Sequence, residues 1–570
     1  MLKWLRKIIL PARRAGLKRC LHRLKRIGMT RYWAPRRLGP SLAKATFSGL
    51  DAQADDGLRE ALGQLVRARA DSEWAQAWNR EAGTLVLLGQ TPFPMRQRPD
   101  GSQAPCSDPL WLFVFHGWEW AWPHFCQDTA RKDVLEAVNN WWQANPMGGG
   151  FAWEPYPTSR RLTAWCVAYV TLGLGEEVGL YLARTAHYLA RRLERDLDNN
   201  HLFVNLKALV FFDLVLPGAR DLAAQQLSCA EFVTTLQRHV LPDGGHFEAS
   251  SGYHLGTWLD ALDVALLARA RKQAMDPALD TIIRNMEDFA ITLLRPDGHM
   301  PMLGDSVTDE PLPFAVISAL ARQLHPEAPA PVEQSRVMAD SGYSVLRKGE
   351  GNRRTYVCFD HGNLGPDHCP GHGHADMLAL EVWSGNQPVL LDSGTYQYKG
   401  GERRSYYRST AAHNTVTVDG LDQVDFVGPF RIGYLGHCKL VDHELGPNKD
   451  RVVGEHDGYM RLKGKVTHRR EVRLNNWSDL VIVDSFSGSG RHLLELRLHF
   501  APGVTVEIRG KGVVITLGNG TRRQLLMPER EGLSLERGYH SETWFQETEI
   551  TVLCYRLEAD LPCEFQLILS

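Results

Sequence analysis

The chain has 570 residues, of which 44% are hydrophobic and 23% charged, with a formal net charge of -1. This length exceeds what one hydrophobic core normally serves and predicts about two or three domains. No apolar run reaches the roughly 18 residues needed to cross a bilayer, so no membrane-spanning helix is expected. The ten cysteines are scattered without a CxxC pair, which excludes a disulfide framework.

The first 44 residues form a basic segment, because they hold 14 of the 65 Lys and Arg residues and no Asp or Glu. Apolar residues recur from Trp4 to Ile27 with gaps near three and four. This pattern is typical of an amphipathic helix on an anionic membrane surface. A solvated arm that packs on the acidic remainder explains it equally well. No recognition motif for nucleic acid occurs, so nucleic acid is not an expected partner.

The same segment bears on location. The apolar stretch from Leu2 to Leu10 is interrupted by three basic residues, which makes it a poor secretory signal. We therefore expect a cytoplasmic protein or one that is peripheral at the inner membrane, with the periplasm as the alternative.

Residues 45–324 show helical periodicity. The clearest apolar stripe runs from Leu255 to Ala270, and similar stripes occupy Leu180–Leu193 and Ala208–Leu216. Short breaks containing Gly, Pro and Asp separate these stripes. Consecutive helices with short connections favour antiparallel pairs, as in a helix bundle or an α/α toroid.

The helical pattern stops at a proline-rich stretch, where we place an interdomain linker at 325–334. From 335 to 570 the apolar period changes to two. Runs such as Leu480–Val483 and Leu493–Phe500 are separated by Gly and Asn turns, as at Gly518-Asn519-Gly520. Many short strands at such spacing predict an antiparallel β-sandwich.

A metal site is predicted in the β-rich part. In a strand, His372 and His374 of Gly-His-Gly-His-Ala-Asp would lie on one face, because side chains alternate. Asp392 and His413 follow within a few dozen residues. Two imidazoles and a carboxylate are ligands that zinc accepts, with a fourth position left for water. On spacing alone, a structural or surface role for the HxH pair stays open.

Polar residues at two helix starts form a second group of candidates. Asn199, Asn200 and His201 open the helix that continues to Leu216, and Tyr253 precedes the Leu255 stripe. Exposed N–H groups at helix N-termini favour anions. Capping explains the asparagines adequately, but it explains His201 and Tyr253 less well.

Aromatic residues are concentrated in the helical part. Half of the chain's 16 tryptophans lie between Trp111 and Trp165, and most of them are expected in the core. Trp153, Tyr156, Arg160 and Arg161 lie together in one short stretch. Aromatic faces stack on sugar rings, and Arg holds carboxylates or sulfates bidentately. These four residues are therefore candidates for substrate contact.

At these motifs the sequence resembles heparinase II/III-like proteins. The resemblance covers about Thr91 to Gly420 and rests on motifs in this order: Trp153-Glu-Pro-Tyr-Pro, Asn200-His201, Gly-Gly-His-Phe-Glu with Tyr253-His254, His372-Gly-His-Ala-Asp376, Leu-Leu-Asp-Ser-Gly-Thr-Tyr396, and Tyr407 to Val416. It implies an incomplete (α/α) toroid followed by an antiparallel β-sandwich. It also implies a lyase that cuts an acidic, uronate-containing polysaccharide by β-elimination.

The resemblance also implies roles for single residues. It makes His374, Asp392 and His413 the ligands of a structural Zn²⁺, and it makes Asn200, His201, Tyr253 and His372 the catalytic group. His254, Tyr396 and Arg408 join the candidates for substrate contact. In one respect the chain departs from the family. It has Val204 and Asn205 where many members carry a Glu after the helix-opening His, so no carboxylate is expected there.

The chemistry of elimination fits these residue types. The C5 proton must be removed, the C4 oxygen expelled and the uronate carboxylate neutralised, a task that suits Asn200 and His201. Tyr253 serves as base, acid or both, and as a base its pKa would have to fall. His372 takes the proton when base and leaving group lie on opposite faces. The alternatives are a hydrolase using Glu154 and Glu248, or a non-catalytic protein of capsule or lipopolysaccharide assembly.

Overall fold

The computed structural model describes residues 56–570 except 71, 309, 328, 329, 331, 478 and 511. The basic segment 1–44 lies outside the described residues, so its predicted membrane helix stays a prediction. Within the described ranges no helix is long and apolar enough to cross a membrane. The nine described cysteines are free thiols.

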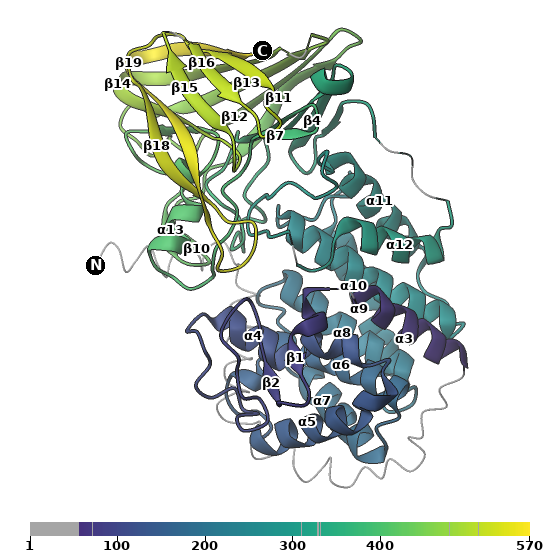
Figure 1. The fold of residues 1–570 in the computed structure, drawn as a ribbon. Coiled ribbons are helices and arrows are strands. Elements are labelled where there is room, and N and C mark those ends of the chain that lie inside the picture. Colours follow the sequence, from purple (N-terminus) through teal and green to yellow (C-terminus); the bar gives the residue numbers. More distant parts are fainter. Residues whose placement is uncertain are drawn as a thin grey trace.

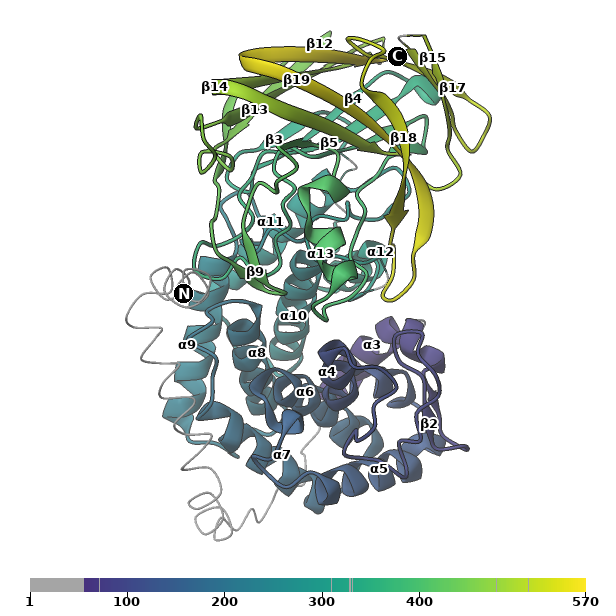
Figure 2. The same ribbon diagram turned by 90° about the vertical axis from the view of Figure 1, so that its left-hand side faces the viewer.

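Helices build the first part of the chain (Figure 1). They are α3 (Asp56–Arg69), α4 (Pro109–Gly117), α5 (Arg131–Ala144), α6 (Pro155–Leu172), α7 (Glu176–Ala190), α8 (Asn200–Val215), α9 (Leu222–His239), α10 (Ser251–Ala270), α11 (Pro277–Leu293) and α12 (Phe314–Leu324). A two-stranded sheet of β1 (Trp78–Asn79) and β2 (Thr84–Leu85) accompanies them. The helices follow an arc that opens toward the β-rich part (Figure 2).

Apolar burial explains the arrangement of the helices. Nearly all residues of α6 and α8 are buried, because these two helices are enclosed by neighbouring helices. The tryptophans expected in the core are there: Trp111, Trp118, Trp120, Trp141, Trp153 and Trp165 are each at most 1% exposed. The predicted stripes over 180–193, 208–216 and 255–270 fall in α7, α8 and α10.

Strands build the rest of the chain. A five-stranded sheet contains β3 (Arg336–Met338), β4 (Tyr343–Lys348), β5 (Thr355–Asp360), β6 (Leu380–Ser384) and β7 (Gln387–Leu390) in that order. The larger sheet has the order β11 (Cys438–Leu445), β12 (Lys449–His456), β13 (Thr467–Asn475), β14 (Leu480–His499), β19 (Thr548–Leu569), β17 (Arg522–Leu526), β16 (Gly512–Thr516) and β15 (Thr505–Arg509). β18 (Leu533–His540) pairs with β19, and β8 (Val416–Val418) pairs with β14.

The two sheets form a sandwich. Val357 and Phe359 of β5 share one hydrophobic core with Val472 of β13 and Ile482 of β14, and the strand pairs within each sheet are antiparallel. The other face of the smaller sheet contributes Val345 and its neighbours to the helical core. The predicted fold class, a helical domain followed by an antiparallel β-sandwich, is confirmed.

One predicted detail is wrong. Leu480–Val483 and Leu493–Phe500 are not two strands, because the first run and all of the second except Phe500 lie in β14, a single strand of 20 residues. The polar stretch between them still pairs with β19, with a register shift between Phe486 and Gly490. Gly488 and Gly490 adopt positive φ values there, so the strand bends without ending.

The segment that follows α11 joins the two domains. Backbone N–H groups of Asp305 and Thr308 donate to the carbonyls of His372 and Glu542. From the other side, the backbone N–H groups of Tyr398 and Lys399 donate to the Asp108 carboxylate, which also caps α4. These contacts bring the first turns of α8 and α10 against loops of the sandwich.

Candidate active site

The first turn of α8 carries two of the predicted catalytic residues. The Asn199 side chain caps the helix by accepting from the His201 backbone N–H at 3.1 Å. Glu248 accepts from both the backbone N and the Nδ2 of Asn200, at 2.6 and 2.9 Å. The positive end of α8 is therefore already satisfied by a protein carboxylate. His201 contacts Glu194 and Tyr156.

A carboxylate lies beside His201 although the sequence offers none at positions 204 and 205. Glu194, from the loop before α8, has both carboxylate oxygens 3.2 Å from His201 Nδ1. Asn205 orients that loop, since its Oδ1 accepts from the Glu194 backbone N–H at 2.9 Å. Glu194 thus places a carboxyl group beside His201 from outside α8.

Tyr253 lies in the first turn of α10, which Ser250 caps. Its hydroxyl is 3.0 Å from the hydroxyl of Tyr398, which follows β7. Burial and the neighbouring Tyr398 raise the pKa of Tyr253 well above its usual value. This direction is opposite to the lowered pKa that a tyrosine base would require, because burial disfavours the charged phenolate.

His372 meets Tyr253 across the domain boundary. The two ring centroids are 3.9 Å apart, and His372 Nε2 is 3.5 Å from Asn200 Nδ2. The predicted strand geometry is wrong, because residues 371–374 form a loop between β5 and β6. Gly373 permits this loop, since a Cβ there would lie 2.2 Å from the Leu364 carbonyl oxygen.

Asp305 connects the two histidines of the HxH motif. Its Oδ2 is 3.0 Å from His372 Nδ1, its Oδ1 is 3.0 Å from His374 Nε2, and Arg404 forms a bidentate ion pair with it. Burial would raise the pKa of Asp305, but Arg404 and the two histidines hold it well below its usual value. The carboxylate is therefore charged, and it fixes the orientation of both imidazoles.

The three predicted metal ligands come together behind this loop. The side chains of His374, Asp392 and His413 are buried, and their ligand atoms lie within 4.8 Å of one another. His413 Nδ1 is 2.6 Å from Asp392 Oδ2. His374 Nδ1 and His413 Nε2 are buried without a hydrogen-bond partner, which is costly unless an ion or water is bound. The residues thus fit a metal ion bound by imidazole and carboxylate.

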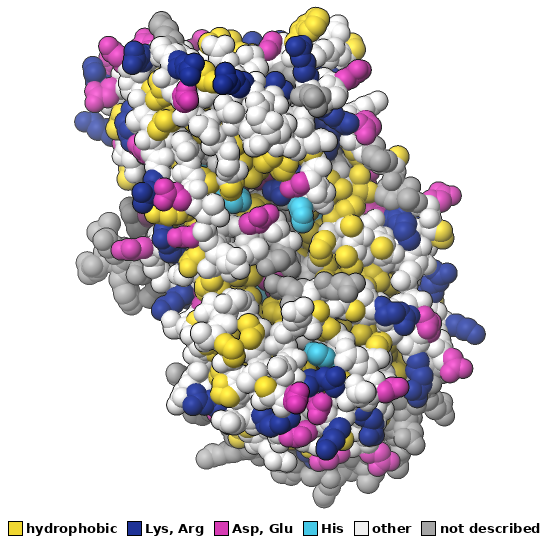
Figure 3. Space-filling model, in the orientation of Figure 1, with side chains coloured by type: hydrophobic (Ala, Val, Ile, Leu, Met, Phe, Trp, Pro, Cys, Tyr) yellow, Lys and Arg dark blue, Asp and Glu magenta, His cyan; other side chains and the backbone are white. Residues whose placement is uncertain are grey.

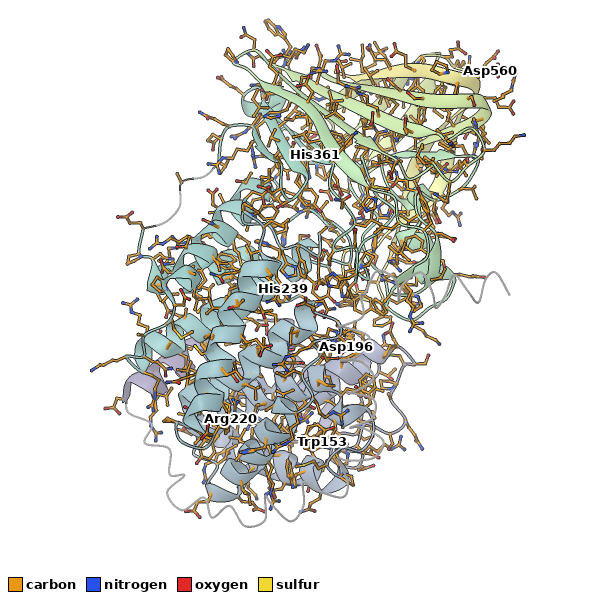
Figure 4. All side chains as sticks on the ribbon, turned by 180° about the vertical axis from the view of Figure 1, so that it is seen from behind. Trp153, Asp196, Arg220, His239, His361 and Asp560 are labelled. Atoms are coloured by element: carbon orange, nitrogen blue, oxygen red, sulfur yellow. The ribbon has the colours of Figure 1, made fainter. Side chains whose placement is uncertain are left out.

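Four residues predicted to contact substrate are in the core instead. Trp153 and His254 are each 1% exposed and Arg161 is 0% exposed, and Figure 4 shows Trp153 among the helices. Arg161 donates to the carbonyls of His116 and Ala152. Arg408, 2% exposed, donates to the carbonyls of Gly371 and Gly373 and holds the histidine loop. Its pKa falls to about 9 through burial and nearby Arg404.

The other predicted contacts are only partly buried. Tyr156 has its ring 4.5 Å from that of His201, and Arg160 donates to its hydroxyl at 3.2 Å. Burial raises the pKa of Tyr156 to about 12. Arg160 is also paired with Asp260, so its charge is already compensated. Tyr396 stacks on Tyr407 at 6.0 Å beside the sandwich.

Sequence reasoning missed several residues of this site. Glu194, Asp305, Tyr398 and Arg404 were not predicted, and Glu248 was considered only for hydrolysis. Asp305 lies in Leu-Gly-Asp-Ser, a short loop with no periodic signal. Tyr398 and Arg404 were visible only as neighbours of the Tyr396 motif. Figure 3 shows hydrophobic side chains and a few histidines between the sandwich at the top and the helices at the bottom.

A helical domain and an antiparallel β-sandwich thus meet at this group of residues, and comparison with known proteins identifies the family. The family description "Heparinase II/III N-terminus" matches residues 121–326, and "Heparinase II/III-like, C-terminal" matches residues 330–565. The chain therefore belongs to the heparinase II/III family.

The individual relatives have low sequence identity to this chain. The chain is 26% identical over 449 residues to a heparin-sulfate lyase of Bacteroides stercoris, covering 73% of this chain and 64% of the relative. It is 24% identical over 459 residues to the heparin-sulfate lyase of Pedobacter heparinus, covering 73% and 66%. The chain thus spans slightly less than two thirds of the length of these relatives.

Solved structures share the fold. A heparinase III crystal structure superposes with a TM-score of 0.69 at 16% identity, covering 92% of this chain and 86% of that one. The heparan sulfate lyase of Pedobacter heparinus gives 0.59 at 17% identity, covering 98% and 88%.

Proposed function

We propose that this chain is a polysaccharide lyase that cleaves a uronate-containing glycan by β-elimination. The observation that carries the proposal is the meeting of Tyr253 and His372, whose rings lie 3.9 Å apart although they belong to different domains. Asn200 is beside them. The names of the relatives, heparin-sulfate lyases, support the same reaction class.

We assign the two proton transfers of the elimination to different residues. A raised pKa keeps the Tyr253 phenol protonated, so it acts as the acid that protonates the departing C4 oxygen. With Nδ1 of His372 facing the Asp305 carboxylate, its Nε2 is the nitrogen that takes the C5 proton. Asn200 and His201 donate hydrogen bonds to the uronate carboxylate and stabilise the charge that develops there.

The contact between the two rings favours elimination from one face of the sugar. Because their centroids are only 3.9 Å apart, no sugar ring fits between them, and both groups reach the substrate from the same side. In glucuronate the C5 hydrogen and the C4 oxygen lie on one face, whereas in iduronate they lie on opposite faces. We therefore propose glucuronate as the preferred uronate.

Zinc is the metal that we propose for the His374, Asp392 and His413 group, because two imidazoles and a carboxylate form a ligand set that it accepts. When bound, the zinc ion would hold together the three chain segments that carry these residues. His374 belongs to the loop of His372, and Asp305 contacts both. The chain's own residues then keep His372 in one orientation.

Hydrolysis is less well supported. It requires two carboxylates across the cleaved bond, but Glu248 is 1% exposed and accepts both hydrogen bonds from Asn200. Glu154 directly precedes α6, the buried helix that also carries Arg161.

The test is incubation with an unsulfated glucuronate polysaccharide and with an iduronate-rich one. We expect products that absorb in the ultraviolet and lack the added water of hydrolysis, from the glucuronate polymer only. Saturated products or none from either polymer would refute the lyase. Elimination confined to the iduronate polymer would refute attack from one face and leave the lyase standing.

We also propose that segment 1–44 attaches the chain to anionic membranes, on the cytoplasmic side of the inner membrane. The reason is its composition, since it contains 14 Lys and Arg residues and no Asp or Glu. The full chain should sediment with anionic vesicles and not with zwitterionic ones. A chain without residues 1–44 should stay in solution with both. Equal sedimentation of the two chains would contradict this role.

A further inference from the structure

We propose that Phe430 forms a sugar-stacking subsite next to His372, where it binds the residue that adjoins the cleaved uronate. This inference rests on the proposed function and specifies part of its substrate-binding site. Phe430 lies in the turn between β9 (Phe426–Gly428) and β10 (Arg431–Ile432). Its ring centroid is 5.8 Å from that of His372, at an interplanar angle of 67°.

The exposure of this ring is unusual for its position. Phe430 is 37% exposed, and it takes part in neither of the two hydrophobic cores of the described residues. A phenylalanine that contributed only to folding would gain by being buried. We interpret this ring as a binding surface because it is both exposed and in contact with His372, one of the proposed catalytic residues.

Two buried arginines hold the turn in place. The carbonyl oxygen of Pro429 accepts from Arg404 Nε at 3.2 Å and Nη2 at 3.1 Å, and from Arg408 Nη1 at 2.6 Å. Both arginines are 2% exposed. Charge-assisted bonds of this kind keep the turn rigid, so little entropy is lost when a ligand orders the ring.

Arg404 also connects the turn that carries Phe430 to the proposed catalytic residues. Arg404 forms the bidentate ion pair with Asp305, whose carboxylate faces His372 Nδ1. Phe430 therefore has a fixed position relative to His372.

Contacts around the ring indicate what it binds. Tyr398 approaches at 5.1 Å and 76°, and the Arg404 guanidinium lies 5.1 Å from the ring centroid. These groups cover part of Phe430 and leave the remainder exposed. An aromatic face carries negative charge density, which attracts the C–H groups on the apolar face of a pyranose. The ligand class is thus a pyranose unit of the glycan chain.

The test compares Phe430→Ala and Phe430→Trp with the wild-type chain, with Trp477→Ala as the matched control. Trp477 is 77% exposed on the turn between β13 and β14, where its neighbour Asn476 contacts Asn448. Calorimetry measures Kd for size-defined heparan sulfate oligosaccharides and for unsulfated glucuronate oligosaccharides. Ultraviolet absorbance measures kcat and KM for the parent polymers, and thermal melting checks folding.

We expect Phe430→Ala to raise Kd and KM by roughly threefold to tenfold, with kcat and the melting temperature unchanged. Phe430→Trp should bind as well as the wild type, and Trp477→Ala should change nothing. Unchanged Kd in Phe430→Ala, a fall in kcat alone, or a wild-type chain that binds none of the oligosaccharides would each overturn the subsite. Binding that depends on Phe430 without any unsaturated product would refute the lyase and keep the subsite.

Discussion

The helical domain and the sandwich place their proposed catalytic residues in different ways. Asn200 and Tyr253 lie in the first turns of α8 and α10, whose ends are fixed by the caps Asn199 and Ser250 a few residues away. His372 lies on an irregular loop that is held by buried charged side chains distant in sequence, among them Asp305 and Arg408. The helical half of the site is thus organised locally, whereas the sandwich half depends on tertiary ion pairs and on the proposed metal.

This difference has a physical consequence. A helix cap contributes about 1 kcal/mol and acts within one turn. A buried carboxylate that binds an arginine and two histidines concentrates several kcal/mol in one side chain. Damage to the sandwich half should therefore affect stability and catalysis together, while the helical half should allow the two to be separated.

The largest effect is expected from Tyr253→Phe, which tests that separation. Loss of the proposed proton donor should lower kcat by about 10³-fold, with an unchanged melting temperature, because the ring is retained. Tyr398→Phe is the matched control. It removes the hydrogen-bond partner at 3.0 Å and not the donor, so a loss of only about tenfold is expected. Equal activity of Tyr253→Phe and the wild type would exclude Tyr253 from the mechanism.

Asp305→Asn should show the opposite behaviour in the sandwich half. It leaves Arg404 buried without its ion pair and should lower the free energy of unfolding by about 3 kcal/mol, measured by urea denaturation. Metal content and activity should fall in the same variant. Glu60→Gln, in an exposed pair with Arg67, should change stability by less than about 1 kcal/mol. Equal stability of the two variants would contradict the concentration of energy at Asp305.

The sandwich should also respond to acid. Burial would raise the pKa of Asp484, but Arg470 and His468 lower it to about 2. A depressed carboxyl pKa stabilises the fold above the unfolded value near pH 4, and this contribution is lost as the pH falls toward 2. The wild type should thus lose about 2 kcal/mol more than Asp484→Asn between pH 5 and pH 2. Parallel losses in urea titrations would contradict the assignment.

The smallest effect is expected in the helical half. Asn199→Ala removes the cap of α8 and should cost about 1 kcal/mol of stability, whereas Asn199→Asp should retain it. Chemical denaturation of the two variants measures the difference. If alanine and aspartate behave alike, the cap does not organise the first turn of α8.

The contrast also explains what could be predicted. Helical periodicity identified α7, α8 and α10, and the predicted helix starts placed Asn200 and Tyr253 near the N-termini of α8 and α10, because these signals act within a few residues. The strand expected for His372 and His374 was wrong, because the Gly373 loop is stabilised by Arg408 and Asp305 from elsewhere in the chain. Glu194 approaches His201 from the loop before α8, and no local pattern in the sequence revealed this contact.

The same limit applies to burial. Trp153 and Arg161 belong to a stretch whose composition is typical of sugar binding. Both nevertheless pack inside the helical domain, at and just before the enclosed helix α6. Phe430, on a short turn without periodicity, is the exposed ring beside the site instead. Composition alone could not indicate Phe430, because its position beside His372 depends on the fold.

The most direct test of the account is a crystal structure of the Tyr253→Phe variant with a bound glucuronate oligosaccharide. The account predicts one uronate ring with its C5 hydrogen facing His372 Nε2 and its C4 oxygen facing residue 253, both from the same side, and the next sugar on Phe430. An oligosaccharide bound elsewhere, or a ring that contacts only one of the two domains, would contradict it.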